Sequence, residues 1–249
     1  MGAGRPPIPL VYRFVALVMR PLLRLVLRYE VHGEENIPLG GFIVAVNHNS
    51  HSDPFPWAHV LYNRGIPPVF LAKDSLFKVP VIAWVMRSTH QVKVERERAA
   101  AAQSLPHARA ALAQGHCLGV YPEGSLTRDP DEWPMRGKTG AARLALESGC
   151  PVIPVAHWGA QGLLPPYARV PRIWRRHTVE IRFGEPVDLA DLREQPTSSQ
   201  VVATATDRIM RAITDELEQI RGLRAPEERF DPKAHGMTPT GRYSRGENT

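Results

Sequence analysis

The chain has 249 residues, 43% of them hydrophobic, a net charge of +6 and a pI near 9.6. A chain of this length buries a sizeable core by itself, which excludes a small domain that depends on disulfide bonds or a structural metal. The positive charge favours an anionic partner, and nucleic acid, anionic lipid and a phosphorylated substrate all stay open at this point.

The two cysteines, Cys117 and Cys150, lie in apolar runs beside glycine. Cysteines in such runs behave as small hydrophobic residues, so buried free thiols are expected. They form neither a disulfide framework nor a metal-binding pattern, and a reducing, cytoplasmic environment is therefore the default expectation.

The N-terminal segment, residues 1–28, is apolar but carries a stripe of arginines. At 100° per residue, four of them fall within an arc of about 80°: Arg13, Arg20, Arg24 and Arg28. The segment has no cleavage site of a signal peptide and too many charges for a membrane span. It is predicted to be an amphipathic helix in a membrane interface, which Pro21 kinks or divides into a pair. An ordinary helix packed on the domain is the alternative.

Strands and helices alternate along the rest of the chain. Strands are predicted at 29–38 (with a turn), 41–46, 69–72, 91–94, 116–121, 151–157 and 178–183. Helices are predicted from Pro54, with Ser52 or Asp53 as its cap, and at 81–86, 96–114, 138–148 and 200–223. This alternation predicts one α/β domain, residues 29–223, with a central sheet flanked by helices. Residues 224–249 are rich in proline, glycine and charge, and are expected to be mostly disordered.

A polar cluster follows the buried strand 41–46, and active sites of α/β sheets gather at strand ends. In this cluster Asp53 comes five residues after His48. A loop of that length can turn back so that the carboxylate accepts from one imidazole nitrogen while the other faces outward. Such a pair suits a general base, and no serine nucleophile is needed if the substrate brings its own hydroxyl.

Two other interpretations of this cluster stay open. Asp53 could simply cap a helix, with His48 as a polar loop residue. His48, His51 and Asp53 also resemble part of a metallo-hydrolase cluster, but no further ligand follows to complete it. No metal is therefore predicted.

The run Asn47 to Asp53 resembles the His-x4-Asp motif of the glycerolipid acyltransferases, the 1-acylglycerol-3-phosphate acyltransferases and their relatives. Three further blocks resemble those of the family and follow in the same order. The second block consists of residues 73–80, Trp84 and residues 94–96. The third is residues 121–125 (Tyr-Pro-Glu-Gly-Ser), and the fourth is residues 152–155 (Val-Ile-Pro-Val). The four blocks span roughly residues 40–160. A single such motif is weak evidence, but four in order are specific.

The resemblance implies that His48, oriented by Asp53, deprotonates the acceptor hydroxyl, which then attacks an acyl thioester. The acceptor would be 1-acylglycerol-3-phosphate and the product phosphatidic acid, with acyl-CoA or acyl carrier protein as co-substrate and no other cofactor. Backbone N–H groups near Gly124 would stabilise the oxyanion. The protein would be peripheral or monotopic on the cytoplasmic face of the cell membrane.

The resemblance also implies a set of substrate-binding residues. Lys73 and Arg96 would hold the acceptor phosphate, because arginine matches phosphate oxygens with a fork of donors. The residues that would shape acceptor binding are Glu123, Gly124 and Ser125. Members with Glu-Gly-Thr-Arg-Ser have an arginine where this chain has Leu126, so Arg128 or Lys138 would take over that phosphate contact.

Other functions remain to be separated from this one. The acceptor could instead be glycerol-3-phosphate or another lysophospholipid or glycolipid. A nucleic-acid-binding module is disfavoured because the basic residues show no compact cluster with interleaved aromatics, so no nucleic-acid partner is expected. A catalytically silent membrane-binding protein is disfavoured because His48 and Asp53 are both present.

Overall fold

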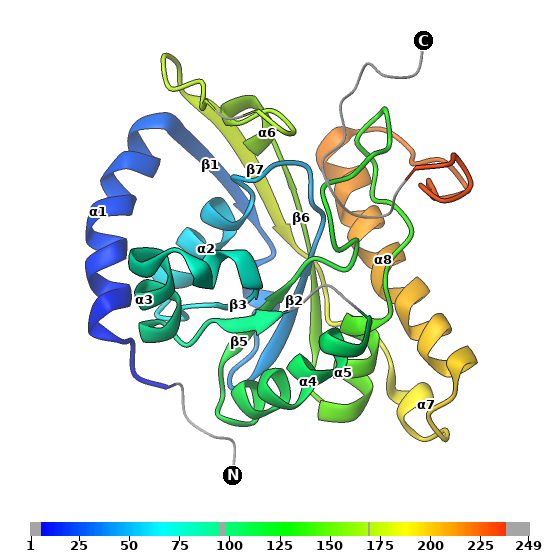
Figure 1. Ribbon diagram of the computed structural model, residues 1–249. Coiled ribbons are helices and arrows are strands. Elements are labelled where there is room, and N and C mark those ends of the chain that lie inside the picture. Colours follow the sequence, from blue (N-terminus) through cyan, green and yellow to red (C-terminus); the bar gives the residue numbers. More distant parts are fainter. Residues whose placement is uncertain (1–5, 95–97, 169, 238–249) are drawn as a thin grey trace.

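The computed structural model describes residues 6–94, 98–168 and 170–237. Within these ranges seven strands form one sheet, in the order β1-β7-β6-β2-β5-β3-β4 (Figure 1). The strands are β1 (Leu27–His32), β2 (Phe42–Val46), β3 (Val69–Lys73), β4 (Val92–Val94), β5 (Cys117–Val120), β6 (Val152–Trp158) and β7 (His177–Phe183). Neighbouring strands are parallel, except that β6 and β7 are antiparallel.

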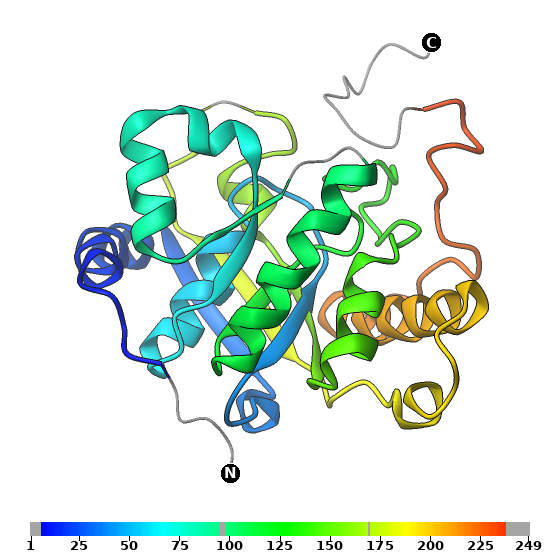
Figure 2. The same ribbon diagram turned by 60° about the horizontal axis from the view of Figure 1, so that its bottom comes forward.

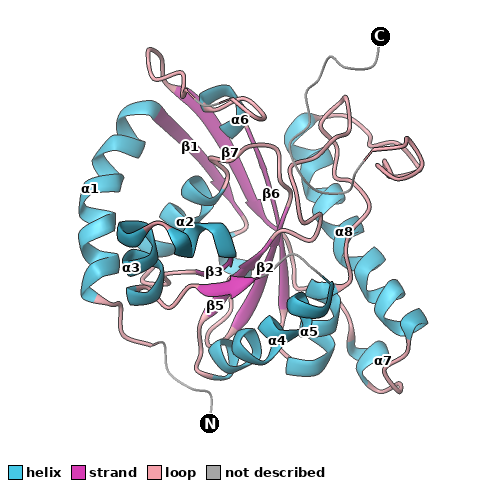
Figure 3. Cartoon of the chain, in the orientation of Figure 1, coloured by secondary structure: helices cyan, strands magenta, loops and turns pink. Residues whose placement is uncertain are grey.

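Helices cover both faces of the sheet (Figures 2 and 3). The α-helices are α1 (Leu10–Val26), α2 (Pro54–Asn63), α3 (Pro80–Ser88), α4 (Arg98–Ala113), α5 (Gly140–Ser148), α6 (Ala160–Leu163), α7 (Ala190–Arg193) and α8 (Ser199–Arg221). Two short 3₁₀ helices are also present in the described ranges, η1 (Glu34–Asn36) and η2 (Asp74–Lys78). α1 and α2 pack on one face, with α3 beside α1, and α4, α5 and α8 pack on the other.

The central strand β2 explains why the sheet needs both layers. Successive side chains of a strand point to opposite faces. Ile43 and Ala45 accordingly pack against the α4, α5 and α8 side, and Phe42, Val44 and Val46 against the α1 and α2 side. All five are completely buried, as predicted for a continuous apolar run between two helical layers.

The parallel strands bring the polar segments of the sequence to one edge. β6, β2, β5, β3 and β4 run in the same direction, so their carboxyl ends lie at the same edge of the sheet. The loops that follow β2 and β5, which carry the His48 and Glu123 segments, are therefore neighbours in space although they are about 75 residues apart in sequence.

The predicted single α/β domain is confirmed, and most elements begin and end within two residues of their predicted positions. The predicted helix cap is wrong. Asp53 occupies the position before α2, but its side chain makes no capping hydrogen bond, and the Ser52 hydroxyl donates to the Ala160 carbonyl instead. Pro54, as expected, opens the helix.

The N-terminal segment forms one helix, α1, and Pro21 lies inside it without dividing it in two. One face, which includes Ala16 and Leu23, is buried against the domain. The opposite face exposes large apolar side chains: Leu10, Phe14, Leu17, Val18, Leu22 and Leu25. In the described part of the chain, no helix has the length and apolar character needed to cross a membrane.

The C-terminal segment departs from its expected disorder over residues 225–237. The Arg136 backbone N–H donates to the Phe230 carbonyl, and the Arg136 guanidinium lies 3.0 Å from the Asp231 carboxylate. Phe230 stacks on His235, and Pro232 is buried. Local aromatic and proline contacts thus place a segment whose composition alone is typical of disorder. Residues 238–249 lie outside the described residues.

Candidate active site

Asp53 is the anchor of the loop that follows β2. Its carboxylate is completely buried, and Oδ2 accepts from the backbone N–H groups of Asn49 at 2.6 Å and Ser50 at 2.7 Å. The same oxygen lies 2.9 Å from His48 Nδ1. Because a carboxylate only accepts, Nδ1 carries the proton and the lone pair of the imidazole is on Nε2.

The His48 ring is held flat against Tyr121 from the end of β5. The ring centroids are 4.0 Å apart with an interplanar angle of 23°. The Tyr121 hydroxyl accepts a hydrogen bond from Trp57 Nε1 at 3.0 Å, and burial raises its pKa well above the ordinary value, so it stays neutral. The orientation of His48 is therefore fixed from two directions, by a carboxylate and by an aromatic face.

Glu123 joins the two loops of the site. Its Oε1 accepts from the His48 backbone N–H and its Oε2 from that of Met135, both at 2.9 Å. Burial raises the pKa of this carboxyl group to about 8. The side chain is buried among backbone groups and does not line the cavity described below. Glu123 thus holds the two loops together, and it can shape acceptor binding only through the position of these loops.

A second histidine supports Asp53 from β6. His157 is completely buried, and its Nε2–H donates to the Asn47 carbonyl at 3.1 Å while lying 3.6 Å from Asp53 Oδ2. Burial lowers the pKa of His157, which keeps the ring neutral. Asn47 also connects the loop after β2 to β6, since its side chain accepts from the His157 backbone N–H and donates to the His157 backbone carbonyl.

Tyr121, Asn47 and His157 are site residues that were not predicted from the sequence. Each follows or ends a strand at the edge where His48 was found. The same strand-end rule would have identified them, but which of these ends are neighbours depends on the strand order.

Gly124 turns the chain under Lys138. Its φ of +71° lies in the left-handed region that favours glycine, and a Cβ atom there would lie 2.7 Å from Lys138 Nζ. The Lys138 backbone N–H donates to the Pro122 carbonyl, which fixes the start of its segment on the same turn. The Gly124 N–H itself donates to the Tyr121 carbonyl, so the oxyanion donor expected near this turn would be another backbone N–H group.

The other predicted phosphate-binding residues differ in whether the structure describes them and whether they line the cavity. Lys73 ends β3, paired in register with Val94 at the end of β4, but its side chain is not among those described. Arg96 lies outside the described residues. Arg128 and Ser125 are buried in the turn and do not line the cavity, whereas Lys138 does. Of the two cations considered in place of the missing arginine, Lys138 is the one that faces the site.

His48 opens onto a cavity of about 1140 Å³ that extends between α1, α2, β3 and α3. Gly124 and Lys138 line the same end as His48. Apolar side chains line most of the rest, among them Val15, Ala16, Leu23, Phe55, Ala58 and Met86. The arrangement puts a histidine base and a cation on the wall of a largely apolar space large enough for a chain-like ligand.

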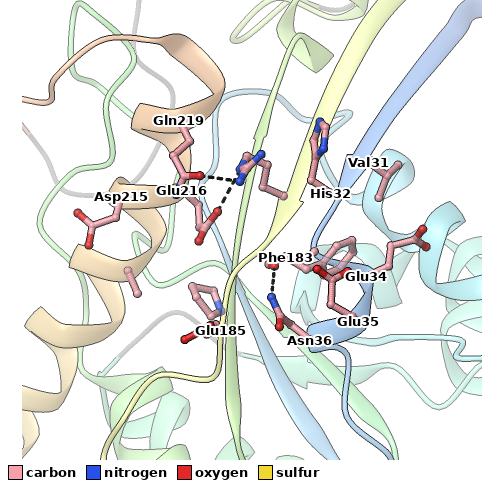
Figure 4. Close-up of a pocket in the computed structure, with 14 residues that line it drawn as sticks. Val31, His32, Glu34, Glu35, Asn36, Phe183, Glu185, Asp215, Glu216 and Gln219 are labelled. Carbon is pink, nitrogen blue, oxygen red and sulfur yellow. Dashed lines mark hydrogen bonds and ion pairs between the residues drawn. The ribbon is translucent and has the colours of Figure 1, made fainter.

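A second hollow, of about 680 Å³, lies at the opposite edge of the sheet between β1, β7 and α8 (Figure 4). Two of its charged groups, Arg182 and Glu216, form an ion pair at 3.2 Å. Asn36 similarly donates to the Phe183 carbonyl. In the described ranges, no group of three or more His, Cys, Asp or Glu side chains is placed to hold a metal ion. The dyad and its cavity are therefore the candidate active site.

Known proteins resemble this chain along the same residues. A 1-acyl-sn-glycerol-3-phosphate acyltransferase of Borreliella burgdorferi is 32% identical over 128 residues, 50% of this chain and 49% of the relative. One of Saccharomyces cerevisiae is 26% identical over 202 residues, 80% of this chain and 62% of the relative. The chain thus matches about half to three fifths of the length of these two relatives.

The fold has a solved counterpart. The crystal structure of the 1-acyl-sn-glycerophosphate acyltransferase PlsC from Thermotoga maritima superposes with a TM-score of 0.63 at 26% identity, covering 87% of this chain and 81% of that one. Residues 28–158, which carry the dyad, the Glu123 turn and His157, match the family described as Acyltransferase. More than half of the chain lies in that match, and the protein belongs to the acyltransferase family.

Proposed function

We propose that this protein transfers a fatty acyl group from a thioester, acyl-CoA or acyl carrier protein, to the free hydroxyl of 1-acylglycerol-3-phosphate, forming phosphatidic acid. The main observation behind the proposal is the His48–Asp53 pair, 2.9 Å apart, with His48 lining the apolar cavity. The similarity to proteins named 1-acyl-sn-glycerol-3-phosphate acyltransferase supports the choice of acceptor.

The dyad supports direct transfer without an acyl-enzyme intermediate. His48 Nε2 takes the proton of the acceptor hydroxyl as its oxygen attacks the thioester carbon. Asp53, a buried anion 2.9 Å away, stabilises the imidazolium that forms. When the tetrahedral intermediate collapses, the C–S bond breaks and the thiolate leaves with the proton from His48. The products are the ester and a free thiol.

The cavity and Lys138 suit the two parts of the substrates. The apolar lining between α1, α2 and α3 fits an acyl chain, which gains free energy in proportion to the apolar area it buries. Lys138, beside Gly124, provides positive charge for the acceptor phosphate near His48. The strand ends of Lys73 and Val94 lie at the same edge, which supports further phosphate contacts from Lys73 and Arg96.

The exposed face of α1 supports action at a membrane surface, which we propose to be the cytoplasmic face of the cell membrane. Phe14, Leu17 and Leu25 project from the helix on the side away from the domain. Arg13 and Arg24 flank this face, where arginine side chains reach anionic headgroups while apolar neighbours enter the lipid. A helix that lies in the interface in this way also lines the cavity with its opposite face, through Ala16 and Leu23.

The first experiment is an acyl-transfer assay with the purified protein in detergent, palmitoyl-CoA as donor and free thiol release as the readout. Lysophosphatidic acid, glycerol-3-phosphate and lysophosphatidylcholine are compared as acceptors. We expect release that requires lysophosphatidic acid and is abolished in His48→Ala, with the fold of the variant unchanged by circular dichroism. A preference for glycerol-3-phosphate or lysophosphatidylcholine would replace the proposed acceptor, and full activity of His48→Ala would refute the mechanism.

Membrane binding is tested separately on vesicles that contain anionic lipid. The variant Phe14→Ser/Leu17→Ser/Leu25→Ser changes only exposed side chains of α1 and leaves its buried face intact. We expect it to sediment less with the vesicles while retaining activity toward detergent-dispersed acceptor. Deleting residues 1–28 would be less informative, because Ala16, Leu23 and Leu27 belong to the core. Unchanged sedimentation would refute the role of α1.

A further inference from the structure

The segment 170–176, between α6 and β7, exposes a cluster of apolar and basic side chains that the mechanism does not use. Val170 is 74% exposed, Ile173 64% and Trp174 73%. Arg172, Arg175 and Arg176 are exposed as well, and the segment contains no acidic residue. Three large apolar side chains within five residues are more than the scattered single exposures that a soluble surface normally carries.

The backbone of this segment is pinned in its outward position. The Arg172 N–H donates to the Leu163 carbonyl at 2.7 Å, and the ring of buried His177 bonds to the Arg172 carbonyl at 2.8 Å. The apolar side chains are therefore presented by a fixed turn. Moving the backbone of the segment inward would break these two hydrogen bonds.

The segment is also tied to the C-terminal end of α1. Arg176 Nη2 donates to the carbonyls of Arg24 at 2.8 Å and Leu27 at 3.2 Å, the position where cations stabilise a helix end. In Figure 1 the yellow-green tip of the segment projects beside that end of the blue helix. The segment thus lies next to the C-terminal end of α1, where the exposed face of that helix ends at Leu25.

We propose that residues 170–176 form a second membrane contact, which inserts Val170, Ile173 and Trp174 into an anionic lipid surface beside α1. Neither α1 nor 170–176 contains an aspartate or glutamate, and the arginines of both match anionic headgroups. Tryptophan is the residue best suited to the boundary between headgroups and acyl chains. The inference extends the membrane association in the proposed function and depends on no residue of the catalytic dyad.

This contact also has a consequence for substrate access. Tyr167 and Ala168, just before the segment, line the active-site cavity beside His51. A tip held in the lipid surface places the mouth of that cavity at the level of the headgroups. An acceptor with one acyl chain can then reach His48 without leaving the membrane surface completely.

The test compares vesicle binding of the wild type with that of Val170→Ser/Ile173→Ser/Trp174→Ser, using phosphatidylcholine vesicles with and without about one third phosphatidylglycerol. We expect at least tenfold weaker partitioning of this variant, because burying even one such side chain accounts for a change of that size. Arg172→Gln and Arg175→Gln should each weaken binding about fivefold, and only to the anionic vesicles. The matched control Leu39→Ser/Leu223→Ser, which removes exposed leucines elsewhere, should bind like the wild type.

Depth of insertion is measured independently through tryptophan fluorescence quenched by brominated lipid. Trp174→Phe keeps an apolar ring, so the protein should still bind, but the quenchable part of the emission should fall. Equal vesicle binding of the wild type and the triple serine variant would overturn the proposal, as would unchanged quenching in Trp174→Phe. Vesicle binding that is unchanged while KM for an acyl carrier protein donor rises would also overturn it, and would assign the segment to that acidic protein.

Activity toward detergent-dispersed acceptor separates this proposal from the proposed function. The triple serine variant should keep wild-type thiol release in detergent and lose it selectively with vesicle-embedded acceptor. If the wild type transfers no acyl group in either format but the vesicle affinities differ as expected, the membrane contact stands and the proposed reaction falls.

Discussion

The substitution Asp53→Asn isolates the charge of the dyad from its structural role. Asp53 Oδ2 accepts three hydrogen bonds, from His48 Nδ1 and from the backbone N–H groups of Asn49 and Ser50. Oδ1 forms no hydrogen bond with any described residue. In the variant, the amide oxygen can therefore take the place of Oδ2 and the amide nitrogen that of Oδ1. The loop keeps its acceptor and the negative charge is lost, while the amide N–H₂ occupies the buried position of Oδ1, which has no hydrogen-bond partner among the described residues.

The size of the effect follows from the geometry of the charged pair. During transfer His48 becomes an imidazolium whose Nδ1 lies 2.9 Å from a completely buried carboxylate. Two unit charges with centres about 4 Å apart interact by roughly 4 kcal/mol at an effective dielectric constant of about 20. Since about 1.4 kcal/mol corresponds to a factor of ten in rate, we expect kcat to fall about a thousandfold.

The assay is thiol release at saturating lysophosphatidic acid and palmitoyl-CoA, with thermal melting recorded on the same preparations. Asp53→Asn should lower kcat with little change in either KM, because the carboxylate is buried behind His48 and does not reach the substrates. Its melting temperature should fall by less than that of Asp53→Ala, because the amide oxygen keeps the three hydrogen bonds of the loop.

Asp53→Ala is the matched control for folding. It removes the acceptor altogether and leaves the buried N–H groups of Asn49 and Ser50 unpaired, at a cost of about 1–3 kcal/mol each. The alanine variant should therefore be both inactive and clearly less stable. A loss of less than tenfold in kcat for Asp53→Asn would refute the charge-stabilisation argument. An asparagine variant as unstable as the alanine variant would show that the loop depends on the charge.

Three further outcomes can be measured with the same protein. Burial raises the pKa of Glu123 to about 8, so the stability it contributes is present at low pH and is lost as pH rises towards and through 8. The urea midpoint of the wild type should fall over that window, and Glu123→Gln should flatten the fall. Gly124→Ala puts a Cβ 2.7 Å from Lys138 Nζ at a φ of +71° and so displaces the lysine side chain. It should raise KM for lysophosphatidic acid about tenfold if one charge-assisted phosphate contact is lost. An unchanged KM would argue against Lys138 as a phosphate ligand. Ala58→Phe, inside the cavity, should lower the rate with palmitoyl-CoA more than with decanoyl-CoA, and equal rates would place the acyl chain elsewhere.

The elements of the fold could be predicted because their signals are local. The apolar run at Phe42–Val46 is one strand whatever surrounds it, and Gly149 ends α5 in the left-handed conformation that glycine adopts most easily. The capping role considered for Asp53 failed for a reason that local signals cannot reveal. Its Oδ2 is used by three N–H groups of the preceding loop, and in that orientation Oδ1 forms no hydrogen bond with the first turn of α2.

By itself, the sequence determined the α/β class and the dyad, because a strand, the loop after it and a five-residue spacing are properties of neighbouring residues. It could not determine that Glu123 binds backbone rather than substrate, or that Tyr121 and His157 support His48 and Asp53. Those roles depend on which strands lie side by side, with β5 and β6 on either side of β2. Strand order is set by packing of the whole sheet between its two helical layers. The hydrogen bonds of His48 with Glu123 and of Asn47 with His157 link residues 75 and 110 positions apart, and they form only once that packing has formed.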